Sequence, residues 1–111
     1  MSKRNKNKKD NQELDTYKMM ENMELHKVLC EKIHNTCVAK NKDYGNSAAL
    51  TYNKYGMVSY LVRMEDKINR IKSLTVDKNQ QQVKDESVLD TLLDLSNYCL
   101  LAAIDVIKEN K

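Results

Sequence analysis

The sequence predicts an all-α protein, a compact bundle of about four helices, one of them short, with a disordered basic N-terminal tail. The 111 residues include no Pro and only two Gly, so the chain lacks the tight turns that an all-β domain needs. Apolar side chains recur at three- and four-residue steps, which is the spacing of amphipathic helices. With 41% hydrophobic and 32% charged residues, the chain is too apolar to be wholly disordered and too charged for a membrane protein.

Residues 1–12 are a low-complexity segment rich in Lys and Asn, and residues 13–111 are expected to form a single helical domain. The segment carries a formal charge of +4, whereas the whole chain carries +3. The remaining residues therefore sum to −1, and the folded part is close to neutral. A solubilising leader is the simplest interpretation of this tail, and a weak contact with nucleic acid is the alternative. It lacks the apolar stretch of a signal peptide.

The first helix is expected over residues 13–40, where apolar side chains follow helical spacing. Residues 41–46 have turn chemistry, because Asn and Asp bond to nearby backbone groups and Gly takes positive φ angles. A short helix follows over residues 48–55. Gly56 is well placed to end it in a left-handed conformation.

Two longer helices complete the prediction, over residues 57–74 and 85–108, with a polar loop over 75–84 between them. The last helix is apolar over most of its circumference, which is typical of a central helix or one buried by a partner chain. Three other helices, one of them short, can barely surround it. The sequence therefore predicts a homo-oligomer.

The helix over residues 57–74 carries two neighbouring stripes. Its expected core stripe is apolar and consists of Met57, Leu61, Met64, Ile68 and Ile71. A charged strip borders it, with i, i+3, i+4, i+7 spacing: Arg63, Asp66, Lys67 and Arg70. Charges that border a core line a cleft or pair with another buried strip, although ordinary surface pairing has the same spacing.

Asp90 and Asp94 stand one turn apart on the otherwise apolar last helix. A buried carboxylate without a partner costs several kcal/mol, so these acids need cations. The cations of the preceding helix can supply them, which would make the two strips a structural brace. A divalent metal can also do so, because helical carboxylates form a common platform for Mg²⁺ and would leave the Arg and Lys side chains for phosphate oxygens. Both interpretations fit the spacing.

Two polar residues of the segment 41–46 each allow two interpretations. Asp43 could be a metal ligand or a helix cap, and Tyr44 could stack on a nucleobase or pack on the core.

The three cysteines, Cys30, Cys37 and Cys99, sit in apolar helical patterns and are expected to be reduced, buried thiols of a cytoplasmic protein. His26 and His34 fit no zinc template, so a structural metal is not expected.

Three motifs occur in order along the chain: D-Y-G, then R-x-x-D-K-x-x-R, then D-x-x-x-D-x-x-N-Y. They are Asp43, Tyr44 and Gly45; Arg63, Asp66, Lys67 and Arg70; and Asp90, Asp94, Asn97 and Tyr98. Over about residues 36–106 the sequence resembles the first of the nucleotide modification associated domain families, small proteins common in bacteriophages and prophages. The resemblance implies a role in phage nucleotide metabolism or DNA base modification, in the cytoplasm of the host.

A weaker resemblance is to the all-α nucleoside triphosphate pyrophosphohydrolases, which bind Mg²⁺ with E-x-x-E on one helix and E-x-x-D on another. Glu21 and Glu24 supply the first element here. The second departs from the pattern, because Glu86, Asp90 and Asp94 are separated by steps of four.

These observations lead to a hypothesis of nucleotide binding, with the phosphates in a cleft between the helices over 57–74 and 85–108. The candidate nucleotide-binding residues are Asp43, Tyr44, Arg63, Lys67, Arg70, Asn97 and Tyr98, and the candidate ligands of Mg²⁺ are Asp66, Asp90 and Asp94. As an enzyme, the protein would catalyse metal-assisted attack of water on a nucleoside triphosphate. The alternatives are a non-enzymatic sponge that sequesters a cyclic nucleotide immune signal, and a structural or interaction protein.

Overall fold

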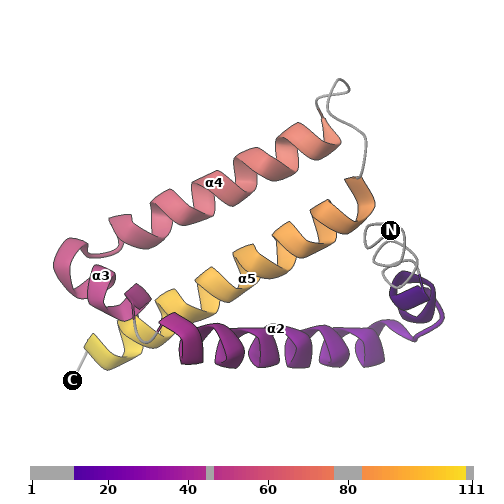
Figure 1. The fold of residues 1–111 in the computed structure, drawn as a ribbon, viewed down its shortest axis with the longest axis horizontal. Helices are drawn as coiled ribbons and strands as arrows, with labels where there is room; N and C mark the ends of the chain where they lie inside the picture. The colour runs from indigo at the N-terminus through magenta and orange to yellow at the C-terminus, as the bar shows by residue number, and fades with distance from the viewer. Residues whose placement is uncertain (1–11, 45–46, 77–83, 110–111) are drawn as a thin grey trace. The chain divides into compact units, whose positions relative to one another are not determined.

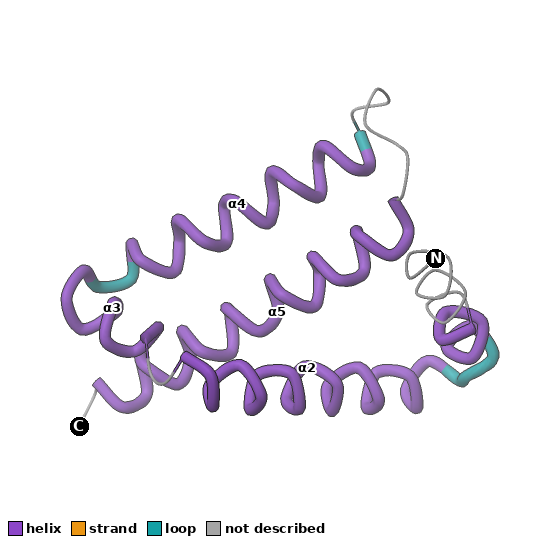
Figure 2. The backbone as a smooth tube through the Cα atoms, viewed as in Figure 1, coloured by secondary structure: helices purple, strands orange, loops and turns teal. Residues whose placement is uncertain are grey.

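The computed structural model describes residues 12–44, 47–76 and 84–109, with the side chains of 42–44 and 84–87 left out of the description. These ranges are helical almost throughout and contain no strand, which confirms the all-α class (Figure 2). The chain divides into two compact units, Met1–Lys32 and Ile33–Lys111. Residues 1–11 of the predicted basic tail lie outside the described residues, and residue 12 already belongs to a helix.

The described ranges hold five helical segments, so the helix count differs from the prediction of about four. The single helix expected over 13–40 is a short helix over residues 12–18 and then α2 (Asn22–Tyr44). The short helix ends where the backbone N–H groups of Met19 and Met20 bond three residues back, in place of the four-residue step of an α-helix. No Gly or Pro marks this break, so the sequence pattern did not reveal it.

A cluster of side chains joins the two helical segments described in the first unit. The hydroxyl of Tyr17 donates a hydrogen bond of 2.5 Å to Oε1 of Glu13, and Nζ of Lys32 lies 2.8 Å from the same oxygen. The ammonium group of Lys32 also lies over the Tyr17 ring, 5.7 Å from its centroid. One glutamate therefore joins the short helix to the middle of α2.

The second unit contains residues 33–44 of α2, then α3 (Ser47–Tyr55), α4 (Val58–Thr75) and α5 (Lys84–Glu109). The bounds of α3, α4 and α5 lie within one residue of the predicted helices. The helices α4 and α5 run antiparallel along each other, and α3 packs against both (Figure 1). Gly56 has φ +74°, which confirms the predicted left-handed turn between α3 and α4. The predicted turn over 41–46 begins too early, because α2 continues to Tyr44.

The core of the second unit is small and aromatic. Tyr60 is 2% exposed, and its ring centroid lies 5.7 Å from that of Tyr52. Ala102 and Thr91 of α5 are the other fully buried side chains among the described residues. Partly buried side chains surround this cluster, namely Ala48, Met64, Tyr98 and Leu101.

The expected core stripe of α4 is buried only in part. Met64 and Ile71 are half-buried, whereas Met57, Leu61 and Ile68 are exposed. The reason is the rotation of α4, which turns Tyr60 rather than the apolar stripe toward α5. The periodicity of the sequence located an apolar stripe, but it did not show whether the second unit buries that stripe.

The cysteines differ from the prediction in the same way. All three are free thiols, but Cys30 and Cys99 are exposed and only Cys37 is half-buried. Cys99 is exposed because it lies on the side of α5 that neither α3 nor α4 covers.

None of the described helices combines the length and the hydrophobicity that a membrane span requires.

Candidate functional site

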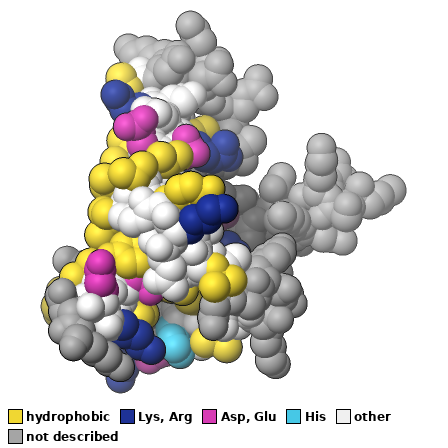
Figure 3. Space-filling model, turned by 90° about the vertical axis from the view of Figure 1, so that its left-hand side faces the viewer, with side chains coloured by type: hydrophobic (Ala, Val, Ile, Leu, Met, Phe, Trp, Pro, Cys, Tyr) yellow, Lys and Arg dark blue, Asp and Glu magenta, His cyan; other side chains and the backbone are white. Residues whose placement is uncertain are grey.

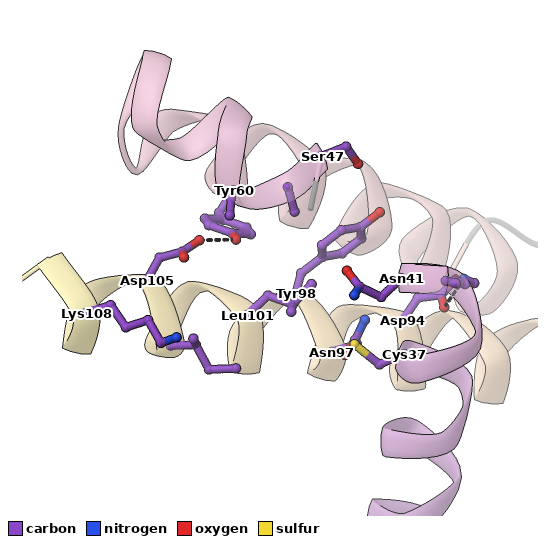
Figure 4. A pocket seen from close by; sticks show the side chains of 14 residues that line it. Cys37, Asn41, Ser47, Tyr60, Asp94, Asn97, Tyr98, Leu101, Asp105 and Lys108 are labelled. Atoms are coloured by element: carbon purple, nitrogen blue, oxygen red, sulfur yellow. Dashed lines mark hydrogen bonds and ion pairs between the residues drawn. The ribbon is translucent and has the colours of Figure 1, made fainter. Parts of the chain in front are cut away.

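A groove of about 370 Å³ opens along the polar side of α5 in the second unit (Figure 4). The α5 side chains that line it recur every three or four residues and therefore share one face of the helix. They are Asp94, Asn97, Tyr98, Leu101, Ile104, Asp105 and Lys108. Cys37, Lys40 and Asn41 of α2 line one side, the first turn of α3 lines another, and Tyr60 of α4 lies at its end.

The carboxylate of Asp94 stands between two lysines from different helices. Its Oδ1 lies 3.7 Å from Nζ of Lys40 on α2, and its Oδ2 lies 3.5 Å from Nζ of Lys67 on α4. Lys67 and Asp94 are half-buried and Lys40 is exposed. Two ammonium groups around one carboxylate leave a positive charge in excess, so this end of the groove favours an anion.

An aromatic ring lies beside these charges. The guanidinium carbon of Arg63 on α4 lies 5.9 Å from the centroid of the Tyr98 ring, within the range of a cation–π interaction. Tyr98 is half-buried, and Asn97 and Asn41 place amide groups in the same groove. Amides both donate and accept hydrogen bonds, so they suit the mixed edge of a nucleobase.

Two tyrosine–carboxylate pairs lie toward the C-terminal end of α5, and one of them, Tyr60 with Asp105, lines the groove. The hydroxyl of Tyr60 donates a hydrogen bond of 2.5 Å to Oδ2 of Asp105, and the hydroxyl of Tyr52 donates one to Oε2 of Glu109. Burial, followed by the bond to Asp105, raises the pKa of Tyr60 well above its ordinary value of 10.0. The hydrogen bond to Glu109 is the main reason that the pKa of Tyr52 is also raised.

The structure brings together only some of the predicted nucleotide-binding residues. Asn97 and Tyr98 line the groove, and Arg63 and Lys67 contact its residues Tyr98 and Asp94. Arg70 is exposed, and no ion pair joins it to another described residue. The side chains of Asp43 and Tyr44 lie outside the described residues.

The three predicted metal ligands have different surroundings. Asp94 lines the groove between its two lysines, whereas Asp66 and Asp90 are exposed. The part of the chain that the structure describes contains no group of three His, Cys, Asp or Glu side chains arranged to hold a metal ion. Asp66, Asp90 and Asp94 therefore do not form a preformed Mg²⁺ site in this structure.

Several groove residues were not predicted to be functional, among them Lys40, Asn41, Tyr60, Asp105 and Lys108. Asp105 and Lys108 continue the α5 strip of Asp94 and Tyr98 at helical spacing, so the periodicity contained a signal for them. Lys40 and Asn41 carried no such signal, because the apolar pattern of α2 does not indicate which of its faces meets α5.

Comparison with family models defines the class of the protein. Residues 40–106 match the model of nucleotide modification associated domain 1. The chain therefore belongs to that family, which confirms the resemblance seen in the three motifs. The match includes α3, α4 and most of α5, which supply most of the groove. Searches of the curated proteins and of the solved structures gave no match.

Proposed function

We propose that the protein binds a phosphate-bearing nucleotide in the groove along α5. The observation that carries the proposal is the convergence of Lys40 and Lys67 on Asp94, one turn from the ring of Tyr98. Cations that already face one carboxylate suit a phosphate, and an aromatic ring suits a base. The groove volume of about 370 Å³ lies in the range of small-ligand sites.

Each residue at this site has its own proposed role in binding the nucleotide. Lys40 and Lys67 hold phosphate oxygens in exchange for the carboxylate of Asp94, with which both ammonium groups pair. Tyr98 stacks on the base, with Arg63 against its ring. Asn41 and Asn97 bond to the polar edge of the base. The role is in keeping with the family, whose description associates it with nucleotide modification.

The proposal departs from the sequence hypothesis in one respect. The phosphate site includes Lys40 of α2 in place of Arg70 of α4, because Lys40 lines the groove and Arg70 does not. The phosphate site is thus formed by side chains of α2, α4 and α5 rather than by a cleft between α4 and α5 alone. Mg²⁺ remains a proposed companion of the phosphates, to be tested as one arm of the binding experiment.

Calorimetric titration with nucleoside triphosphates, cyclic nucleotides, a nucleoside and inorganic phosphate, each with and without Mg²⁺, tests the proposal. The decisive variant is Tyr98→Leu, and its matched control is Tyr55→Leu. Tyr55 also carries a cation over its ring, Lys54 at 5.3 Å, but it is exposed and outside the groove. Loss of base stacking should weaken binding about tenfold or more in Tyr98→Leu alone.

The proposal fails when no nucleotide binds the wild type, or when Tyr55→Leu weakens binding as much as Tyr98→Leu. Recovery of the nucleotide after denaturation then separates two uses of one site. A nucleotide recovered unchanged identifies a binding protein that sequesters its ligand. A hydrolysed one identifies an enzyme.

A further inference from the structure

The helices α4 and α5 share an apolar face that no other described residue of their unit covers. Met57, Leu61 and Ile68 are exposed on α4, and Leu92 and Val106 are exposed on α5. Figure 3, which views the molecule from the left-hand side of Figure 1, shows hydrophobic side chains gathered along one edge of the view. Among the described residues of this unit, three buried apolar side chains form the core, so much of the apolar surface lies outside it.

The spacing of these residues suits packing by further helices. On α4 the apolar stripe follows alternating steps of four and three residues: Met57, Leu61, Met64, Ile68 and Ile71. The same steps occur on α5: Val88, Leu92, Leu95, Cys99, Ala102 and Val106. Alternating steps of four and three are the repeat with which helices interlock side chains over several turns.

The direction of the α4 stripe follows from the contact between Tyr60 and Asp105. Tyr60 is the α4 side chain buried against α5. At about 100° per residue, Leu61 lies about 100° from Tyr60 in one direction and Arg63 about 60° in the other. The apolar stripe and the polar strip of α4 are thus on opposite sides of its contact with α5.

The same relation holds on α5. Val106 lies about 100° from Asp105 in one direction, and the groove residue Lys108 lies about 60° in the other. Because α4 and α5 run antiparallel, equal rotations on the two helices point to the same side of the pair (Figure 1). Both apolar stripes therefore lie on one face of the helix pair, and the groove lies on the opposite face.

We propose that this apolar face, hereafter the α4–α5 face, binds the same face of a second copy of the chain about a two-fold axis. A two-fold interface requires a self-complementary surface, and two parallel uncharged stripes meet that requirement. The 18 residues of α4 make the face about 27 Å long, and the helix pair is about 20 Å wide. That area is of the order of the roughly 800 Å² per partner in a standard interface.

Sedimentation equilibrium of the full chain tests the proposal, with one matched pair of variants. Leu61 is 53% exposed on the α4–α5 face, and its neighbour Val62 is 56% exposed on the outer side of α4. Leu61→Glu buries a charge in the dimer, whereas Val62→Glu leaves its charge in water. We expect a dimeric wild type, a dimeric Val62→Glu and a monomeric Leu61→Glu.

If circular dichroism shows that Leu61→Glu does not fold, cysteine alkylation of the wild type tests the dimer instead. Cys99 lies in the α5 stripe and is exposed in the single chain, as is Cys30 of the first unit. Dimer formation should slow alkylation of Cys99 about tenfold or more as the wild-type concentration rises. Alkylation of Cys30 serves as the internal reference for reagent and handling.

Three results would overturn the proposal. A wild type that stays monomeric at high concentration rules out the second copy, and a protected Cys99 in that monomer would show that the chain itself covers the face. A dimer that survives Leu61→Glu, or one that Val62→Glu dissociates equally, uses another surface. Cys99 alkylation that is independent of concentration in a dimeric wild type leads to the same conclusion.

Discussion

The hydroxyl of Tyr60 on α4 donates a hydrogen bond of 2.5 Å to the carboxylate of Asp105 on α5, and this bond fixes how the two helices face each other. The tyrosine is the most deeply buried side chain among the described residues. The bond also connects the small core to the groove, because Asp105 lines the groove. Several properties of the protein should depend on this pair.

Stability should decrease at alkaline pH because of Tyr60. Its pKa is raised in the folded state, so an unfolded chain loses this proton near pH 10 while the folded chain keeps it. The free energy of unfolding should therefore be unaffected by this group below pH 10 and fall as the pH rises above 10. Urea unfolding from pH 8 upward measures the effect. Tyr60→Phe should flatten the alkaline decrease, and an equally steep decrease in that variant would contradict the assignment.

Truncation should distinguish Tyr60 from a surface tyrosine. Tyr60→Ala removes the centre of the core and should cost about 3–5 kcal/mol of unfolding free energy. Tyr55→Ala, on the exposed end of α3, should change it by about 0.5 kcal/mol or less. Denaturant unfolding of both variants tests this. Similar losses in the two would mean that Tyr60 is not central to the core.

Neutralising Asp94 should strengthen phosphate binding with little effect on stability. Its two ion pairs are long and partly exposed, so Asp94→Asn should cost about 1 kcal/mol or less. Without the carboxylate, Lys40 and Lys67 have no shared counter-ion and should bind inorganic phosphate more tightly. Melting temperature and phosphate titration measure the two effects.

Asp90→Asn is the control for this prediction, because Asp90 lies one turn away on α5, is exposed and is not a groove residue. It should leave phosphate affinity nearly unchanged. A large drop in the melting temperature of Asp94→Asn, with phosphate affinity unaltered, would identify the lysine–aspartate cluster as a structural brace.

Replacing Gly56 should destabilise the protein through its backbone alone. Its φ of +74° is costly for a residue with a side chain, although no atom lies within 4 Å of the position that a Cβ would take. Gly56→Ala should therefore lose about 1 kcal/mol. Gly56→Asn should lose less, since Asn tolerates this conformation better. Equal stability of Gly56→Ala and wild type in thermal unfolding would contradict this account.

The sequence predicted the helices of the second unit well and the arrangement of their faces less well. Gly56 and the polar segments supplied clear ends for α3, α4 and α5. The break after residue 18 had no such signal, since three-residue hydrogen bonds at Met19 and Met20 need no special residue. Local propensity determines helix ends only where Gly, Pro or a capping residue occurs.

The candidate site shows the same limit. Asn97 and Tyr98 were found because they share a face of α5 with Asp94, which periodicity reveals. Lys40 was missed, because its role depends on which side of α2 contacts α5, and the sequence of one helix does not contain that information. The exposure of Leu61 was missed for a related reason, since an apolar stripe reads the same whether its own chain or a second chain covers it.

The opposite faces of the α4–α5 pair make these helices sensitive to insertions and deletions. One extra residue within α4 would rotate everything after it by about 100°. Such a change before Lys67 would turn that lysine away from Asp94 and move Ile68 out of the apolar stripe. A single frame-preserving indel would thus disturb both the groove and the apolar face. Most substitutions affect only one of them, so the lengths of α4 and α5 should vary less among relatives than their surface residues.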